Sequence, residues 1–515
     1  MRHEPLRRWA VPWLSTPWQP ACIEGEQRMR LLNRTVRVAA PTDWNDPALP
    51  LLLRYHLHYF DDLDAEGASA RRVLQRRWMV RWIDEHPPGA FPGWDPYPTA
   101  LRLVNWIKWC WQDGGGREPE AAILDSIATQ AAWLRRNLEF DLLGNHLLAD
   151  AKGLCFAGLF FTGPDGRRWL ERGRSLLLEQ LPRQILADGG HDERSPAYHA
   201  LVLHDLLELV RAWRHVGLTP PEPLCAPVPA MLRWLQVMTH PDGGIAFFND
   251  ATLGQAPGCA HLGRLAVMLA LAEEAHATPP GTVDLPESGY MRLEQGGMVV
   301  LLDAAPAGSA DQPGHAHADT LSFECSLDGR RLIVNSGIDR YGDDAERRWQ
   351  RSTAAHSTLE VDGADSSEVW GGFRLAGRAE IVDRGMRREQ GGVVAWGAHD
   401  GYRRLPGVGI HRREWRLWQG RLEVRDRLEG GGRHRLVSRF YLHPELDAVM
   451  DGEEVALRRS GRTLAVIQAG GAGGRLRLVS ARYFPAFGRV EANRCVELSA
   501  LCTLPAELSA VVVWR

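Results

Sequence analysis

The spacing of apolar residues changes once along this chain, near residue 280, and this change limits the folds that the chain can adopt. Before that point apolar residues recur every three or four positions, as between Leu52 and Leu63, which is the period of an amphipathic helix. After it, short runs such as His411–Leu417 alternate apolar and charged residues, and glycine-rich turns separate them. Helical hairpins followed by strands predict an α+β multidomain chain.

A chain of 515 residues is too long for one hydrophobic core. We expect three parts: an irregular N-terminal arm over residues 1–50, an α/α toroid over 51–280 and an antiparallel β-sandwich over 281–515. The arm is rich in Pro, Trp and Arg and shows no clear periodicity. The closure of the helices into a toroid, an incomplete helical barrel, is expected by analogy, because periodicity alone does not show a ring.

Composition excludes some classes of protein. A net charge of −3 argues against nucleic-acid binding by bulk electrostatics. The eight cysteines are scattered without a Cys-x-x-Cys pair, which is typical of free thiols in a reducing compartment. No run approaches the roughly 18 apolar residues of a membrane span, and the first residues lack the apolar core of a signal peptide. We therefore expect a cytoplasmic protein, or a periplasmic or secreted one if a signal has been removed.

A pair of histidines one residue apart is the strongest candidate for a functional site. His315 and His317 precede an apolar alternating run, so the pattern predicts that both point to the same side of a β-strand. His356 opens another strand-like segment. Crowded imidazoles are suited to metal binding, to acid–base chemistry or to both. The alternative is a set of polar residues on an exposed sheet face.

Two stretches of the helical half carry further candidates. Asn145 and His146 open a predicted helix, and the alternative role of Asn145 is to cap it. Ser195 followed by Pro is typical of a helix start, which places Tyr198 and His199 in the first turn. The alternative role of Tyr198 is ordinary core packing.

These residue types together suit β-elimination from a uronic acid. Removing the C5 proton leaves an enolate-like dianion, whose carboxylate an amide such as Asn145, helped by His146, can neutralise. A Tyr or a His can abstract the proton, and a Tyr hydroxyl can return one to the departing O4. One Tyr can do both if proton and leaving group share a face of the sugar; otherwise a His base must lie opposite.

With these residues the chain resembles the heparinase II/III-type polysaccharide lyases, from about Leu52 to the C-terminus. The motifs that carry the resemblance are Asn145-His146, Glu193–His199, His315–Asp319 and Ala355–Thr358. It implies an α/α toroid followed by an antiparallel β-sandwich. It also implies that Asn145 and His146 neutralise the carboxylate, that Tyr198 is the acid and a candidate base, and that His315 is the opposing base.

The resemblance further implies one structural divalent metal ion, usually zinc, bound by His317, His356 and a third residue. The family commonly has an Asp there, whereas this chain has Asn335. A neutral amide is a weaker zinc ligand than a carboxylate, so manganese or an empty site are alternatives, and Asp339 is a nearby substitute. We expect substrate contacts from a separate set of residues: Glu193, His199, Tyr341 and Arg351.

The expected enzyme is therefore a polysaccharide lyase that acts on a uronate-containing polymer such as a glycosaminoglycan, alginate or a bacterial exopolysaccharide. It would leave a 4,5-unsaturated uronate end. A uronyl C5-epimerase on the same fold is one alternative. A glycoside hydrolase is another, with its two carboxylates among Asp192, Glu193 and Asp250, and a non-catalytic glycan-binding protein is a third. Two stretches, Tyr55–Tyr59 and Ser366–Arg374, resemble the branch encoded with bacterial surface-polysaccharide synthesis.

Overall fold

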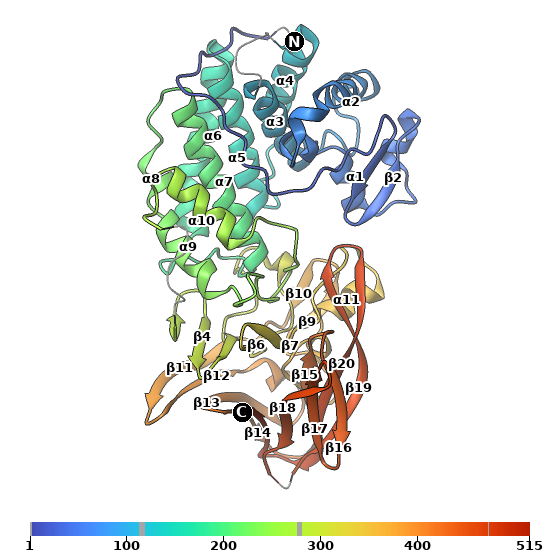
Figure 1. Cartoon of the computed structure of the whole chain (residues 1–515), viewed down its shortest axis with the longest axis vertical. Coiled ribbons are helices and arrows are strands. Elements are labelled where there is room, and N and C mark those ends of the chain that lie inside the picture. The colour runs from blue at the N-terminus through green and yellow to red at the C-terminus, as the bar shows by residue number, and fades with distance from the viewer. Residues whose placement is uncertain (1–2, 113–118, 275–280, 472, 515) are drawn as a thin grey trace. The chain divides into compact units, whose positions relative to one another are not determined.

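The computed structural model describes residues 3–112, 119–274, 281–471 and 473–514 (Figure 1). The chain divides into two compact units that alternate along the sequence. The first comprises Met1–Ile185, Ala200–Pro229 and Ala260–His276, and the second comprises Leu186–His199, Ala230–Cys259 and Ala277–Arg515. This division differs from the single boundary near residue 280 that the sequence predicts. Residue 280 itself belongs to the segment 275–280, which lies outside the described residues. Two stretches of the helical half belong to the unit that holds the sheets.

The N-terminal half consists of helices, as the periodicity predicts. They are α1 (Leu51–Leu57), α2 (Arg72–Glu85), α3 (Pro96–Trp111), α4 (Ala121–Leu134), α5 (Gly144–Phe160), α6 (Pro164–Gln184), α7 (Pro196–His215), α8 (Glu222–Cys225), α9 (Val228–Val237) and α10 (Cys259–Met268). Helices α5 and α6 pack closely because Gly158 and Gly173 lie at their contact, where a Cβ atom would be 2.4 Å from Leu170 N and 2.7 Å from Ala151 O. No helix of the described residues combines the length and the apolar character that crossing a membrane requires.

The N-terminal arm is not wholly irregular. It contains a hairpin of β1 (Arg28–Leu31) and β2 (Arg34–Arg37). Near its start, the Glu4 carboxylate accepts hydrogen bonds from the backbone N–H groups of Asp165, at 3.0 Å, and Gly166, at 2.8 Å. An anion is favourable at this position because the N-terminus of α6 carries unpaired N–H donors. The arm is therefore attached to the helical unit by a specific cap.

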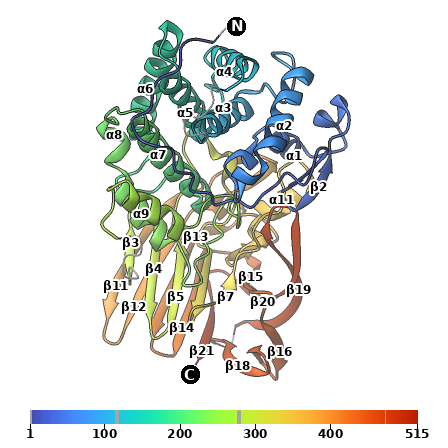
Figure 2. The same ribbon diagram turned by 45° about the horizontal axis from the view of Figure 1, so that its top comes forward.

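The C-terminal half is an antiparallel β-sandwich, which confirms the predicted fold class. In the described part of the chain one sheet has nine strands: β3 (Val283–Leu285), β4 (Tyr290–Gln295), β5 (Met298–Asp303), β6 (Phe323–Leu327), β7 (Arg330–Val334), β15 (Arg433–Leu442), β20 (Arg489–Thr503) and β19 (Arg475–Ala486) in order, with β8 (Leu359–Val361) paired to β15. The other has eight: β11 (Ile381–Glu389), β12 (Gly392–His399), β13 (Val408–Trp418), β14 (Arg421–Gly430), β21 (Ala506–Trp514), β18 (Arg462–Ala469), β17 (Glu454–Arg459) and β16 (Asp447–Asp451). Strand β4 contacts β12 and β13 of the opposite sheet (Figure 2). Large apolar side chains such as Phe323, Trp415 and Phe440 are buried between the sheets.

A buried ion pair lies among these apolar side chains. Arg413 on β13 donates two hydrogen bonds to the Asp426 carboxylate, at 2.7 and 2.8 Å. The Nη1 group of Arg413 donates to the carbonyl oxygens of Leu321, at 2.9 Å, and Ser357, at 2.8 Å. Burial alone would raise the pKa of Asp426, but Arg413 and His411 outweigh it and hold the pKa below its usual range. This pair therefore fixes the two segments that follow the predicted site histidines.

Replacing Asp426 with Asn is expected to lower the free energy of unfolding by about 3–5 kcal/mol at neutral pH, because the Arg413 charge stays buried without a counter-ion. The lowered pKa means that Asp426 contributes fully above about pH 4 and loses its contribution as the pH falls further. Urea unfolding at neutral pH and near about pH 3 checks both points. The difference in free energy of unfolding between variant and wild type should be smaller at the acidic pH. An equal difference at both pH values would contradict this account.

Candidate active site

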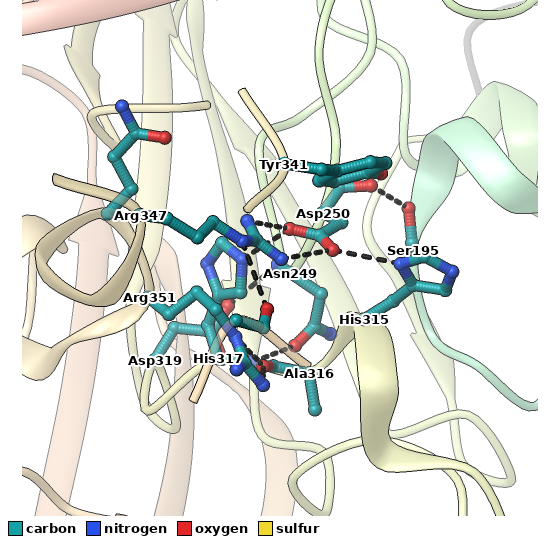
Figure 3. Close-up of polar contacts among 12 residues, drawn as sticks. Ser195, Asn249, Asp250, His315, Ala316, His317, Asp319, Tyr341, Arg347 and Arg351 are labelled. Atoms are coloured by element: carbon teal, nitrogen blue, oxygen red, sulfur yellow. Dashed lines mark hydrogen bonds and ion pairs between the residues drawn. The ribbon is translucent and has the colours of Figure 1, made fainter. Parts of the chain in front are cut away.

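The two predicted site histidines are not on a strand. His315 ends a short 3-10 turn, Pro313–His315, and His317 lies in the irregular segment before β6. The predicted strand alternation is therefore wrong, but the two imidazoles still converge on one partner. The Asp250 carboxylate accepts from His315 Nδ1 through Oδ2 and from His317 Nε2 through Oδ1, both at 2.8 Å (Figure 3). One carboxylate thus orients both rings.

Asp250 is held as an anion. Arg347, from α11 (Ala345–Arg351), donates to both of its oxygens, at 2.5 and 2.7 Å, and both side chains are fully buried. Burial alone would raise the pKa of Asp250, but Arg347 and the two histidines keep it well below its usual range. An ionised acceptor requires His315 to carry its proton on Nδ1, which leaves Nε2 as the basic nitrogen. The nearest acid to Nε2 is Glu193, at 3.9 Å.

Tyr198 lies against His315, as expected if the two act together. Their rings are stacked with centroids 3.9 Å apart, and both side chains retain slight exposure, 6% for Tyr198 and 8% for His315. Ser195 caps the helix as predicted: its Oγ accepts from Tyr198 N at 3.3 Å. The same Oγ donates to the Asp250 carbonyl oxygen at 2.5 Å. The start of α7 and the backbone of Asp250 therefore hold the Tyr198–His315 pair in place.

Tyr341 is the hydrogen-bond partner of Tyr198. The two hydroxyl oxygens are 2.8 Å apart. Burial, with the Asp250 charge adding to it, raises the pKa of Tyr341 well above its usual value. Tyr341 therefore stays protonated at neutral pH and can stabilise negative charge on the Tyr198 oxygen. Its predicted contact with the substrate stays a prediction.

Three residues form a cluster that could hold a metal ion: His317, Asp319 and His356 each have a ligand atom, and these atoms lie within 4.8 Å of one another. His317 Nδ1 and His356 Nε2 are 3.1 Å apart, and His356 Nδ1 binds the Ser352 carbonyl oxygen at 2.7 Å. Burial lowers the pKa of His317 to about 3 and also lowers that of His356. Two of the three predicted ligands are therefore together.

Asn335, the third predicted ligand, has another role. Its amide oxygen accepts from Ser357 N at 2.8 Å, and its amide nitrogen donates to Phe247 O at 2.9 Å and Ser322 Oγ at 3.2 Å. The amide is therefore engaged with two backbone groups and one serine hydroxyl. The prediction for Asn335 is corrected, and Asp319 is the third residue of the cluster. The substitute considered from sequence, Asp339, pairs instead with Arg340 and Gln350.

Two of the predicted substrate-binding residues are structural. His199 is fully buried, with Nδ1 accepting from His191 N at 3.2 Å, Nε2 bonded to Met231 O at 2.9 Å and its ring stacked on Trp234. Arg351 is also fully buried and donates to backbone carbonyl groups, including Ala316 O through two nitrogens. Within the described part of the chain, both side chains bind backbone groups of the protein itself. Both predictions are corrected.

Asn145 and His146 belong to the helical unit. Helix α5 begins at Gly144 after Leu143, so Asn145 lies inside its first turn and is not the cap. His146 is partly exposed; its Nδ1 is 3.1 Å from Glu139 Oε2, and its ring packs against Tyr97 at 4.4 Å. The sequence correctly places this pair at a helix start.

Four residues that lie in this site are not assigned to it from the sequence: Asn249, Asp250, Asp319 and Arg347. From the sequence, Asp250 is considered only as a carboxylate of a glycoside hydrolase. Asn249, with a positive φ of 56°, accepts from His317 N and donates its own N–H to Asp319 Oδ2, both at 2.9 Å. Asp319 lies two residues after His317, so it could have been found within the same motif. Asp250 and Arg347 carry no local signal, because each is far from His315 in sequence.

Helices followed by an antiparallel β-sandwich are the architecture that this chain shares with a solved structure of heparinase III. The heparinase II/III N-terminus family matches residues 121–262, and the heparinase II/III-like C-terminal family matches residues 277–508. The chain therefore belongs to the heparinase II/III-like family, which places it among the polysaccharide lyases.

The chain is also similar to individual proteins and to solved structures. The chain is 28% identical to the FtsZ-localized protein C of Caulobacter vibrioides over 432 residues, 78% of this chain and 72% of that protein. It is 28% identical to the heparin-sulfate lyase of Pedobacter heparinus over 261 residues, 46% of this chain and 39% of that enzyme. A crystal structure of heparinase III has a TM-score of 0.74 at 19% identity, covering 91% of this chain and 78% of that one, and shows the shared fold.

Proposed function

We propose that this protein cleaves a uronate-containing polysaccharide by β-elimination, with Tyr198 and His315 as the groups that move protons. The observation that carries the proposal is the stacked Tyr198–His315 pair, in which ionised Asp250 fixes the basic nitrogen of His315 on Nε2. Elimination requires a base for the C5 proton and an acid for O4, and this pair offers an oriented imidazole nitrogen and a hydroxyl. Asp250 is unsuited to act as one of the two carboxylates of a glycoside hydrolase, because Arg347 and two histidines already bind both of its oxygens.

The proposed steps use these groups in turn. His315 Nε2 takes the C5 proton, the C5–H electron pair forms the C4–C5 double bond, and the C4–O4 bond breaks. The Tyr198 hydroxyl gives its proton to the departing O4, and Tyr341 stabilises the phenolate that remains by a hydrogen bond. His315 then returns the proton to Tyr198 through solvent, which restores both groups. Asn145 and His146 are proposed to neutralise the uronate carboxylate, as the family resemblance implies.

The substrate class is proposed from the relatives. Several are heparin-sulfate lyases, so a glycosaminoglycan is the first polymer to test, with alginate and a bacterial exopolysaccharide as further arms. Incubation with each polymer should raise the ultraviolet absorbance of an unsaturated uronate. New reducing ends without that absorbance would indicate hydrolysis. Deuterium entering C5 from heavy water without cleavage would indicate an epimerase.

We further propose a divalent metal ion, zinc or manganese, at His317, Asp319 and His356. The hydrogen bonds on the far side of each ring support it. His317 Nε2 faces the Asp250 anion and His356 Nδ1 faces a carbonyl oxygen, so in neutral rings both of these nitrogens carry the proton. The two nitrogens that face each other at 3.1 Å then both present lone pairs. A cation shared with the Asp319 carboxylate would relieve this repulsion, and two imidazoles with one carboxylate form a suitable donor set.

A second pair of histidines in the same unit, His399 and His411, differs from the pair His317 and His356. Gly401 N donates to His399 Nδ1 at 3.1 Å, so His399 carries its proton on Nε2 and donates to His411 Nδ1 at 3.0 Å. His411 in turn donates from Nε2 to Asp426 at 2.8 Å. Every lone pair there meets a proton, and no cation is needed. The bound metal would organise the segment that carries His315 and would not be required to touch the substrate.

Replacing Asp319 with Asn is expected to weaken zinc or manganese binding by about 100-fold, because a neutral amide replaces an anionic ligand. Asp339→Asn is the matched control, since Asp339 pairs with Arg340 outside the cluster, and it should leave metal affinity unchanged. Competition with a coloured chelator measures the affinity directly. Equal affinities for wild type and the Asp319 variant would contradict the site.

A further inference from the structure

A small two-stranded hairpin extends from the site and has no role in the proton transfers. It consists of β9 (Glu368–Gly371) and β10 (Arg374–Ala376), which pair with each other and with neither large sheet in the described chain. Its turn region carries two large aromatic side chains with unusual exposure, 62% for Trp370 and 43% for Phe373. We call residues 368–376 the aromatic hairpin.

The aromatic hairpin is fixed to the residues that hold the active site. Arg347, which binds Asp250, also donates from Nε to Gly372 O at 3.2 Å. Arg351 donates to Gly371 O and, at 3.2 Å, to Arg374 O. A Cβ atom on Gly372 would lie 1.9 Å from Gly342 O, so only glycine permits this close approach. The exposed rings are therefore held in a defined place.

Phe373 connects the hairpin to the catalytic pair. Its ring meets His315 edge-on, with centroids 6.1 Å apart, and lies 5.3 Å from the Tyr341 ring. The guanidinium carbon of Arg347 is 5.5 Å from the same ring. Part of the Phe373 ring thus contacts the active-site residues while the rest is open to solvent. The surface of the hairpin continues the active site.

Trp370 is placed by a β-bulge. Gly371 pairs with Arg374 and Val369 with Leu375, so Trp370 is the extra residue without a partner in the ladder. Bulges occur beside active sites because they redirect one side chain. Among the described residues no aromatic ring packs against the Trp370 indole, and Arg374 has no ion-pair partner. The chain therefore presents an open indole and an uncompensated guanidinium on one short hairpin.

This chemistry fits an anionic sugar. A flat aromatic face suits the apolar face of a pyranose ring, and a guanidinium suits a carboxylate or sulfate group. We propose that the aromatic hairpin is a subsite for an anionic sugar that adjoins the cleaved uronate, with Trp370 stacking on its ring and Arg374 pairing with its charge. That the sugar next to this subsite is the one that is cleaved rests on the proposed function.

The test combines binding and turnover. The Tyr198→Phe protein is expected to bind uronate oligosaccharides with little cleavage, so calorimetry on this protein with and without Trp370→Ala measures the subsite alone. We expect the added substitution to weaken binding about tenfold, and Trp370→Ala alone to lower kcat/KM about tenfold with little change in kcat. Arg374→Gln should weaken binding most at low salt and flatten its salt dependence. Leu501→Ala and Arg477→Gln, exposed positions on the sandwich strands β20 and β19, are matched controls.

The outcomes separate this inference from the proposed function. If Trp370→Ala and Arg374→Gln behave as the two controls do while wild type eliminates normally, the subsite is overturned and the lyase stands. If no polymer gives an unsaturated product but oligosaccharide binding still depends on Trp370 and Arg374, the lyase is overturned and the subsite stands. Failure to bind any uronate oligosaccharide would overturn both.

Discussion

Tyr198→Phe is expected to lower kcat by about 10²–10⁴-fold with little change in stability, because it removes the hydroxyl that we propose protonates the leaving O4. The ring remains, so the stacking on His315 is preserved and the fold should not change. The accumulation of unsaturated product under saturating substrate measures the effect. Circular dichroism and thermal unfolding confirm that the variant is folded.

Tyr341→Phe is the matched control for this variant. It removes the hydroxyl that binds the Tyr198 oxygen but leaves the proton donor itself in place. We expect a smaller loss than for Tyr198→Phe, about 10–100-fold in kcat, the size of effect that one hydrogen bond to a charged oxygen provides. A Tyr341 variant as inactive as the Tyr198 variant would mean that the two assignments should be exchanged. A fully active Tyr198→Phe protein would contradict the proposed acid.

Asp250→Asn is expected to have the largest combined effect. Activity should fall by about 10²–10⁴-fold, because an amide no longer enforces the His315 tautomer that leaves Nε2 basic. The free energy of unfolding should fall by about 3–5 kcal/mol, because Arg347 remains buried without its counter-ion. Urea unfolding and the initial rate of product formation measure the two losses.

A surface ion pair provides the control for the stability measurement. Asp383 pairs with Arg412 at 2.6 Å, but both side chains are substantially exposed. Asp383→Asn should therefore change the free energy of unfolding by no more than about 1 kcal/mol. If Asp250→Asn loses stability but keeps the wild-type kcat, Asp250 is structural and does not orient the base. If it loses neither, the assignment of Asp250 as the central anion is wrong.

The sequence predicts features that depend on local chemistry. Ser195 followed by Pro marks the start of α7, because a cap and a first-turn proline act within one turn, and this places Tyr198 correctly. The close spacing of His315 and His317 indicates a site, although the strand expected to carry them is absent. The two rings meet because Asp250 has two oxygens to accept from them, and no alternation rule describes that.

The features of the site that the sequence did not predict depend on contacts between distant segments of the chain. Asp250 and Arg347 are the electrostatic centre of the site, yet neither lies in a motif with the histidines that they orient. The family pattern points to Asn335 as a metal ligand, whereas the folded chain engages that amide with Ser357, Phe247 and Ser322. His199 and Arg351 have the side chains of ligand-binding residues but are buried in structural networks. The metal ion and the cellular location stay predictions.

The masses of the oligosaccharide products test the central claim most directly. Elimination adds no water, so the two fragments of each cut should together have the mass of the intact chain, and one should carry the unsaturated uronate. The Tyr198→Phe protein should give no such fragments from the same substrate. Fragments that together exceed the intact chain by the mass of one water would show hydrolysis and contradict the account.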